Sequence, residues 1–304
     1  MKKSDRVKCI FCGEKANFFL VKADRVSGKP YDIYKCTACK SGFVFPIPNE
    51  VELSNFYKHA NTPRELYLRS LSALDAMDEI LRGEEDFPNS TVDAIRLSKT
   101  GSKFTELGEA LDVGAGYGFT SRELKKLGYD VTALEVGEAS RKVFNELCGF
   151  NALPTFFNEE FCSKNSSKFD LVILSQVIEH LSFDKNPLKN INTVLKDEGV
   201  VVLAFPNFSS LLAMLLRKRD FFLIPPEHLN YFAKTSICEL LLKEGFEILK
   251  VETVSRFNPE SLNKFGIFKP VISTVLRAFL KFSDSIGRGM FLNIYARKVG
   301  IEGD

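Results

Sequence analysis

A glycine-rich turn between an apolar segment and a helical one constrains the fold of this chain more than any other feature. The sequence LDVGAGYGFT occupies residues 111–120, and the apolar segment before it begins near Leu107. Glycines at alternate positions allow a tight turn and leave room for a ligand beside the main chain. The free N–H groups at the start of the following helix favour an anionic part of that ligand. The segment therefore predicts a strand, a ligand-binding turn and a helix.

The glycine spacing, Gly-x-Gly-x-Gly over residues 114–118, differs from that of a dinucleotide-binding fingerprint. Phe119 stands where the fingerprint has its third glycine, which argues against NAD as the ligand. The helix that follows is expected to have Thr120 or Ser121 as its N-cap and Gly128 directly after its last turn.

Two carboxylates flank the turn and indicate what it binds. Asp112 lies two residues before the first glycine, where it is placed to bind a ligand ammonium. A second apolar strand, DVTALE, ends in Glu135, at the distance from the turn where a carboxylate binds ribose hydroxyls. A ligand with an ammonium, a carboxylate and a ribose but no pyrophosphate fits S-adenosylmethionine (SAM). In these features residues 106–298 resemble the class I SAM-dependent methyltransferases.

That resemblance implies a fold and a set of cofactor contacts. The expected fold is an α/β, Rossmann-like sheet of seven strands, whose last strand runs antiparallel between strands five and six. A third strand near residues 150–153 is expected to lead into a turn where Phe157 stacks on the adenine, while Ser175 and Gln176 line the floor. The implied cofactor-binding residues are Asp112, Gly114, Ala115, Gly116, Glu135, Val136, Phe157, Ser175 and Gln176.

Two C-x-x-C pairs near the N-terminus form the second specific motif. Their cysteines are Cys9 with Cys12 and Cys36 with Cys39. This spacing is typical of a tetrahedral zinc site with four thiolates. Disulfides or redox-active thiols are the alternatives, but no secretory signal is visible and a reducing cytoplasm is expected. Four thiolates complete the coordination shell, so the zinc is expected to be structural.

The N-terminal segment is also basic. Ten Lys and Arg against four Asp and Glu give residues 1–45 a charge of +6, although the whole chain carries only +2. Together with Phe11, Tyr31 and Tyr34, this charge suits RNA phosphates and bases. An RNA methyltransferase is therefore one alternative, although a charge excess is more often a solvated face. A non-enzymatic module that binds SAM as a sensor and docks on a partner is the second alternative.

The 304 residues are expected to form three parts. The parts are a zinc ribbon (1–48), a helical connector or lid (49–105) and a methyltransferase domain (106–304) with an insertion at 206–232. The ribbon and the Pro-x-Pro after it resemble the zinc-binding N-terminal segments of bacterial sugar and small-molecule methyltransferases. In the connector, helical periodicity is expected over residues 63–83 and 91–99, and Tyr57 and Tyr67 are candidate ligand contacts.

The acceptor is expected where the fourth strand and the insertion meet the cofactor. The string QVIEHL at residues 176–181 resembles the same segment of ubiquinone-type O-methyltransferases, and its His180 is a candidate general base. Glu227 and His228 match an element of sugar C-methyltransferases that also contains a tyrosine. In this sequence Pro225 stands at the position of that tyrosine. The resemblance implies catalytic roles for His228, His180 and Glu227. The departure at Pro225 argues against C-methylation and favours a hydroxyl of a sugar or related small metabolite as acceptor. For each histidine the alternative is a structural role, in which it bonds a loop or a backbone group.

No membrane-spanning segment is expected, because the apolar run over residues 208–216 is short and ends in three basic residues. Two stretches, 211–224 and 265–282, combine apolar and basic side chains. Such stretches suit peripheral contact with a membrane or a lipid-linked acceptor. Packing in the core is the simpler explanation of both.

Overall fold

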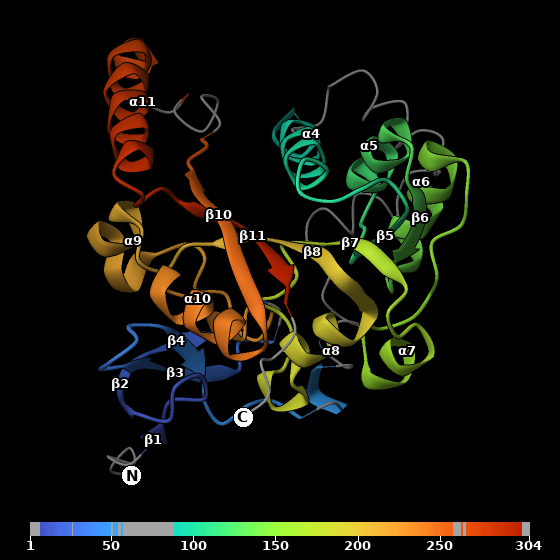
Figure 1. Cartoon of the computed structure of the whole chain (residues 1–304). Coiled ribbons are helices and arrows are strands. Elements are labelled where there is room, and N and C mark those ends of the chain that lie inside the picture. The colour runs from blue at the N-terminus through green and yellow to red at the C-terminus, as the bar shows by residue number, and fades with distance from the viewer. Residues whose placement is uncertain are drawn as a thin grey trace.

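The computed structural model describes residues 7–25, 27–49, 51–53, 56, 88–257, 263 and 266–299. Within these ranges the chain forms a large central sheet with helices on both faces and a smaller sheet beneath it (Figure 1). The predicted helix over residues 63–83 and the candidate contacts Tyr57 and Tyr67 lie outside the described residues.

Six strands of the described chain form the central sheet. In spatial order they are β10 (Phe246–Val254), β11 (Phe291–Lys298), β8 (Leu195–Pro206), β7 (Phe169–Ser175), β5 (Glu109–Val113) and β6 (Asp130–Leu134). The last four are mutually parallel, whereas β11 runs antiparallel to both of its neighbours. The prediction of an antiparallel last strand between strands five and six is therefore confirmed.

The predicted count of seven strands is not confirmed in the described residues. The expected third strand near residues 150–153 makes a single parallel bridge, between Leu134 and Leu153. Pro154 follows this bridge, and the Thr155 amide bonds back to the carbonyl of Leu153 instead of continuing along β6. The ladder at this edge of the sheet ends there because the chain turns away after one residue.

Helices cover both faces of the central sheet. On one face, α4 (Pro88–Gly101) and α5 (Phe119–Leu127) bury Leu97 and Leu124 against Leu171 and Ile173 of β7. The intervening residues of β7 point to the other face, which α8 (Pro187–Val194) and α10 (Lys234–Lys243) cover. Because β7 is buried on both faces, its sequence is almost entirely apolar. Two further helices, α6 (Glu138–Cys148) and α7 (Glu159–Lys164), complete this part of the chain.

The smaller sheet joins the N-terminal segment to the insertion. Its strands, in order, are β1 (Val7–Lys8), β2 (Lys15–Ala23), β3 (Pro30–Cys36), β4 (Gly42–Val44) and β9 (Asn230–Tyr231). The last strand comes from the insertion and pairs antiparallel with β4, so that Gly42 faces Tyr231 and Phe43 faces Asn230. A strand encoded almost two hundred residues later therefore completes the sheet of the cysteine-rich segment.

The two sheets also share one hydrophobic core. Phe11, which lies between the first two cysteines, contacts Phe183 and Phe232 with ring centroids 5.3 and 5.1 Å apart. All three pack in the cluster that also holds Leu188 and Ile191 of α8. The cysteine-rich segment is therefore packed against the helical face of the central sheet.

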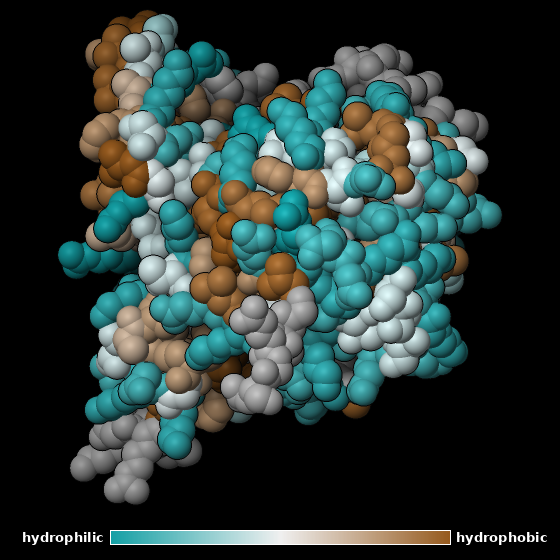
Figure 2. All heavy atoms as spheres, in the orientation of Figure 1, coloured by the Kyte–Doolittle hydropathy of each residue, from teal (hydrophilic) through white to brown (hydrophobic). Residues whose placement is uncertain are grey.

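Beyond this core, α9 (Leu211–Leu216) leads into η2 (Arg217–Arg219). Helix α11 (Lys269–Ser285) projects past the edge strand β10, to which its C-terminal end is hydrogen-bonded (Figure 1). Figure 2 shows apolar side chains along α11, at the upper left of the molecule. Among the described residues, the apolar stretches of the helices are all too short to cross a bilayer.

Candidate active site

The glycine turn lies at the carboxyl end of β5, where parallel sheets bind their ligands. Gly114, Gly116 and Gly118 all have positive φ, at 64°, 56° and 89°. A Cβ on Gly114 would lie 2.6 Å from a methyl carbon of Val177, so glycine is required there for packing. A Cβ on Gly116 would meet no atom within 4 Å. The open space beside Gly116 is the cradle that a ligand against the main chain requires.

The helix after the turn begins earlier than predicted. Gly118, not Thr120 or Ser121, is the N-cap of α5, and it makes no side-chain capping bond. Its left-handed φ, which glycine adopts without strain, lets the chain enter the helix at Phe119. The Ser121 hydroxyl instead donates a hydrogen bond to Oδ2 of Asp112, at 2.6 Å. Gly128 is the C-cap, as predicted.

Asp112 is buried at the end of β5, with 2% of its surface exposed. Burial and, to a smaller extent, the neighbouring charge of Glu135 raise the pKa of its carboxyl group to about 7, against the hydrogen bond from Ser121. A buried carboxylate without a countercharge is unfavourable, so a cationic ligand group placed here would stabilise its ionised form.

Glu135 follows β6 directly and contacts the same turn. Its Oε2 accepts a hydrogen bond from the Gly116 amide at 2.9 Å, and its Oε1 accepts one from the Gly137 amide at 2.6 Å. The two acidic side chains therefore lie at the ends of adjacent parallel strands, on either side of the cradle. Val136, the next predicted contact, is exposed beside them.

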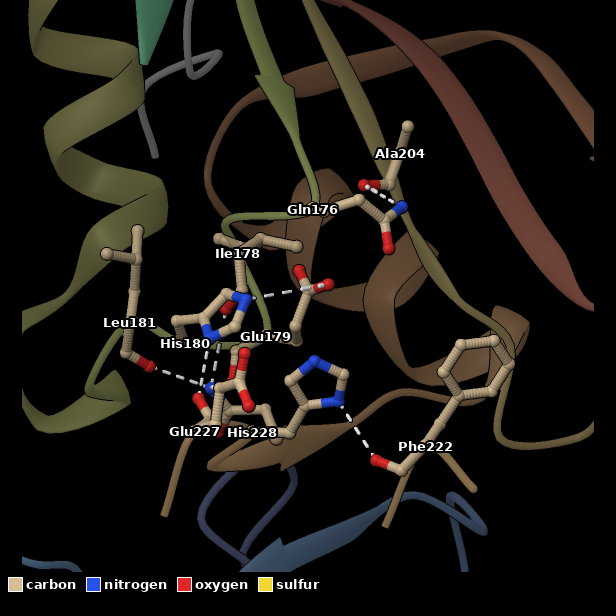
Figure 3. Close-up of polar contacts among 10 residues, drawn as sticks. Gln176, Ile178, Glu179, His180, Leu181, Ala204, Phe222, Glu227 and His228 are labelled. Atoms are coloured by element: carbon tan, nitrogen blue, oxygen red, sulfur yellow. Dashed lines mark hydrogen bonds and ion pairs between the residues drawn. The ribbon is translucent and has the colours of Figure 1, made fainter. Parts of the chain in front are cut away.

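The remaining predicted cofactor contacts have different surroundings. Ser175 ends β7, the strand beside β5, and is partly exposed. The side-chain amide of Gln176 donates to the Ala204 carbonyl at 3.2 Å, so it is directed toward β8 (Figure 3). Phe157 is partly buried and packs beside Phe161.

The two candidate catalytic histidines, 48 residues apart in sequence, lie side by side (Figure 3). Their ring centroids are 4.8 Å apart and the rings are nearly perpendicular, at 79°. Nδ1 of His180 bonds to the backbone carbonyl of Glu227 at 2.6 Å, and Nδ1 of His228 bonds to the carbonyl of Phe222 at 2.9 Å. The carbonyls only accept, so each Nδ1 carries the proton and each Nε2 carries the lone pair.

Glu179, which was not predicted, completes this group. It is 1% exposed, and its carboxylate lies 4.0 Å from Nε2 of His180. Burial raises the pKa of Glu179 to about 8, lowers that of His180 to about 4 and lowers that of His228 to about 3. Both imidazoles are therefore neutral near pH 7. The sequence signal for Glu179 was its position next to His180 at the end of a buried strand.

The four N-terminal cysteines converge at the turns beside β1 and β3. Sγ of Cys9 lies 3.7 Å from that of Cys39, and Sγ of Cys12 lies 3.5 Å from that of Cys36. All four sulfurs lie within 4.8 Å of one another, and none forms a disulfide. Tetrahedral coordination at a Zn–S distance of about 2.3 Å separates sulfurs by about 3.8 Å. The cluster therefore fits a zinc ion.

The family model described as "Methyltransferase domain" matches residues 92–251. The ubiquinone biosynthesis O-methyltransferase of Caulobacter vibrioides is 29% identical over 112 residues, which are 36% of this chain and 44% of that protein. The enzyme of the same name from Rickettsia canadensis is 25% identical over 152 residues, 47% of this chain and 64% of its own. The chain thus spans about half the length of the curated relatives it matches.

Among solved structures, a SAM-dependent methyltransferase from Archaeoglobus fulgidus superposes with a TM-score of 0.51 at 20% identity. The match covers 68% of this chain and 93% of that one. This likeness establishes the class I fold of the central sheet.

Proposed function

The chain belongs to the methyltransferase-domain family, and on that premise we propose that it transfers a methyl group from SAM to a small polar acceptor. The glycine turn between Asp112 and Glu135 carries the proposal. The open cradle at Gly116 and two carboxylates at the ends of adjacent strands match the ammonium and the ribose of SAM. The methyl group of bound SAM is already activated by the positive charge on its sulfur.

The protein residues then contribute mainly alignment. Asp112 binds the ammonium, the amides of the turn bind the carboxylate, and Glu135 exchanges its bond with the Gly116 amide for the ribose hydroxyls. Holding two reactants in line is worth about 7–11 kcal/mol of the barrier. We assign the floor of the site to Ser175 and Gln176, with Val136 and Phe157 at the adenine.

The acceptor side is assigned to the histidine group, and the acceptor to a hydroxyl of a sugar or related metabolite. The names of the relatives support an oxygen acceptor. His180 and His228 are neutral and carry their lone pairs on Nε2, so they are able to take a proton from a hydroxyl, while Glu227 holds His180 through its carbonyl. Removal of that proton by a positioned base is worth about 10²–10⁴-fold in rate.

The basic N-terminal segment gives only weak support to the RNA alternative, because some of its cations have partners in the protein. Lys35 is half-buried over the rings of Phe19 and Phe208, and Lys29 is paired with Glu52. Both cations already have partners in the protein itself. The cysteine cluster fits reduced thiolates, which is consistent with the proposed cytoplasmic location.

We also propose that the protein makes peripheral contact with a lipid surface. On α11, Val271, Val275 and Phe282 expose an apolar stripe, and Arg217 to Arg219 follow the exposed Leu215 of α9. Apolar side chains with nearby cations suit an anionic membrane. Co-sedimentation with vesicles that contain anionic lipid tests this part.

Calorimetry with SAM tests the cofactor site. Asp112→Ala and Glu135→Ala are expected to weaken SAM binding by at least tenfold, because each removes a charge-assisted bond worth about 1.5–3 kcal/mol. Glu138→Gln, which removes an exposed carboxylate three residues beyond Glu135, is the matched control and should leave the affinity unchanged. Unchanged affinity in both site variants would rule out this cradle.

The acceptor class is tested by methyl transfer from tritiated SAM into fractionated cell extract. Label is expected in the small-molecule fraction. Label confined to RNA would support the first alternative, and SAM binding without any transfer would support a sensor.

A further inference from the structure

Glu179, His180 and His228 converge on one point beside the acceptor end of the sheet (Figure 3). One ligand atom from each residue lies within 4.8 Å of the other two. Glu179 and His180 follow β7, whereas His228 comes from the insertion. The cluster therefore forms only when the insertion folds back over the end of β7.

Both imidazoles are held in the orientation that a metal ligand requires. Each Nδ1 donates to a backbone carbonyl, that of Glu227 for His180 and that of Phe222 for His228. Such a bond fixes the tautomer and directs the Nε2 lone pair, as it does for most histidine ligands of metals. In Figure 3 the Nε2 sides of both rings face the Glu179 carboxylate.

The carboxylate itself provides an independent observation. Both oxygens of Glu179 are buried and lack a hydrogen-bond partner among the described residues. An isolated buried carboxylate costs several kcal/mol, and such groups in native proteins are almost always paired or bound to a metal. The separation of 4.0 Å between its oxygen and Nε2 of His180 is too long for a hydrogen bond. It is close to the spacing of about 3.4 Å for two ligands of one tetrahedral ion.

We propose that Glu179, His180 and His228 bind a divalent transition-metal ion, separate from the zinc of the four cysteines. Two imidazole nitrogens and one carboxylate oxygen favour Zn²⁺, Co²⁺, Ni²⁺ or Fe²⁺ over Mg²⁺ and Ca²⁺, which prefer oxygen ligands. Three protein ligands leave a coordination position open. The side chain of His180 is 22% exposed, so the cluster is open to solvent beside this residue.

The consequence for catalysis rests on the proposed function. An acceptor hydroxyl in the open position would become more acidic through the charge of the ion. Its proton passes to solvent, its oxygen forms the new bond to the methyl carbon, and the electron pair of the broken S–CH₃ bond remains on sulfur. In that case His180 and His228 act as ligands and not as proton acceptors.

Cobalt uptake by the full-length protein as purified tests the site. After equilibrium dialysis against Co²⁺, mass spectrometry is expected to find one Co²⁺ per chain in addition to zinc. Its visible spectrum is expected to contain d–d bands without the intense charge-transfer band of thiolate ligands. Glu179→Gln and His228→Gln should each weaken Co²⁺ binding by at least tenfold. Asp184→Asn, an exposed carboxylate on the same connection that is partnered by Ser182, should bind as the wild type does.

Three results would overturn the proposal. The first is that the wild type binds no Co²⁺ even at a saturating concentration. The second is that bound Co²⁺ shows thiolate charge-transfer bands alone, and the third is that both ligand variants bind as much Co²⁺ as the wild type. Should a variant fail to fold, the anomalous Co²⁺ signal in wild-type crystals decides, because it must lie between the three side chains. Calorimetry with SAM on the same samples separates the two proposals. A protein that binds SAM but no Co²⁺ would contradict only the metal site. A protein that binds Co²⁺ but no SAM would contradict only the proposed function.

Discussion

The surroundings of Asp112 set the pKa of its carboxyl group. Its pKa lies at about 7 because the side chain is buried and faces another carboxylate, Glu135. The ligand-free protein therefore binds a proton at Asp112 that it must lose when a ligand ammonium occupies the site. A raised pKa of this kind links ligand affinity to pH.

We expect the affinity for SAM to fall as pH decreases below about 7, approaching about tenfold per pH unit. Above this pKa Asp112 is ionised before the ligand binds, so affinity should be nearly constant. Calorimetry from about pH 8 to about pH 5 measures the effect. Asp112→Asn should bind SAM weakly and without this dependence. An equal pH dependence in that variant would assign the proton to another group.

Gly116 and Gly118 allow packing in the turn to be tested separately from ligand binding. At Gly118 a Cβ would meet Cys148 and the ring of Phe144, whereas at Gly116 it would enter open space. Gly118→Ala is therefore expected to destabilise folding by about 2–4 kcal/mol, from crowding and from its positive φ. Gly116→Ala should cost about 1 kcal/mol of stability but weaken SAM binding, because its Cβ enters the cradle. Denaturant unfolding and calorimetry on both variants test the contrast, which equal losses in both measurements would contradict.

At the scale of elements, the pairing of β4 with β9 links the cysteine cluster to the acceptor side. Cys39 lies three residues before β4, and His228 lies two residues before β9. The Tyr231 hydroxyl also donates to the His228 carbonyl at 3.0 Å. Disruption of the cysteine cluster should therefore loosen the segment that holds His228.

Hydrogen exchange in a Cys39→Ser variant tests this link. We expect faster exchange in β9 as well as in β3 and β4, because β4 is the one described strand that pairs with β9. A substitution is preferable to a chelator, which would also act on the metal ion that we propose at the histidines. Cys238→Ser, at a cysteine outside the cluster, is the control. Unchanged protection in β9 would show that the insertion is held by other contacts.

At the scale of the whole molecule, the shared core is expected to make the two sheets unfold as one cooperative unit. Phe11 is 6% exposed and contacts rings from both the 3₁₀ turn η1 (Phe183–Lys185) and the chain after β9. We expect Phe11→Ala to lower the free energy of unfolding by about 3–5 kcal/mol. Both sheets should still unfold in one transition. Calorimetric unfolding measures this, and Phe18→Ala, at a half-exposed ring on β2, should cost far less. Two separate transitions would indicate independent domains.

Local sequence was informative wherever local geometry decides the structure. The glycine turn, the C-cap at Gly128 and the buried β7 were predictable because backbone sterics and hydrophobic periodicity act over a few residues. The two cysteine pairs were equally readable because metal coordination requires such spacing. The N-cap was mispredicted, because the Ser121 hydroxyl is taken by Asp112 from a neighbouring strand.

By itself, then, the sequence determined the class of the fold, the cradle between two acidic groups and the four-thiolate cluster. Only the tertiary structure decided that β9 completes the N-terminal sheet, that the third strand shrinks to one bridge, and that Glu179 faces two histidines. The reason is physical. These contacts join residues far apart in the chain, and such pairs are selected by burial and packing of the whole core, which leave no local pattern in the sequence.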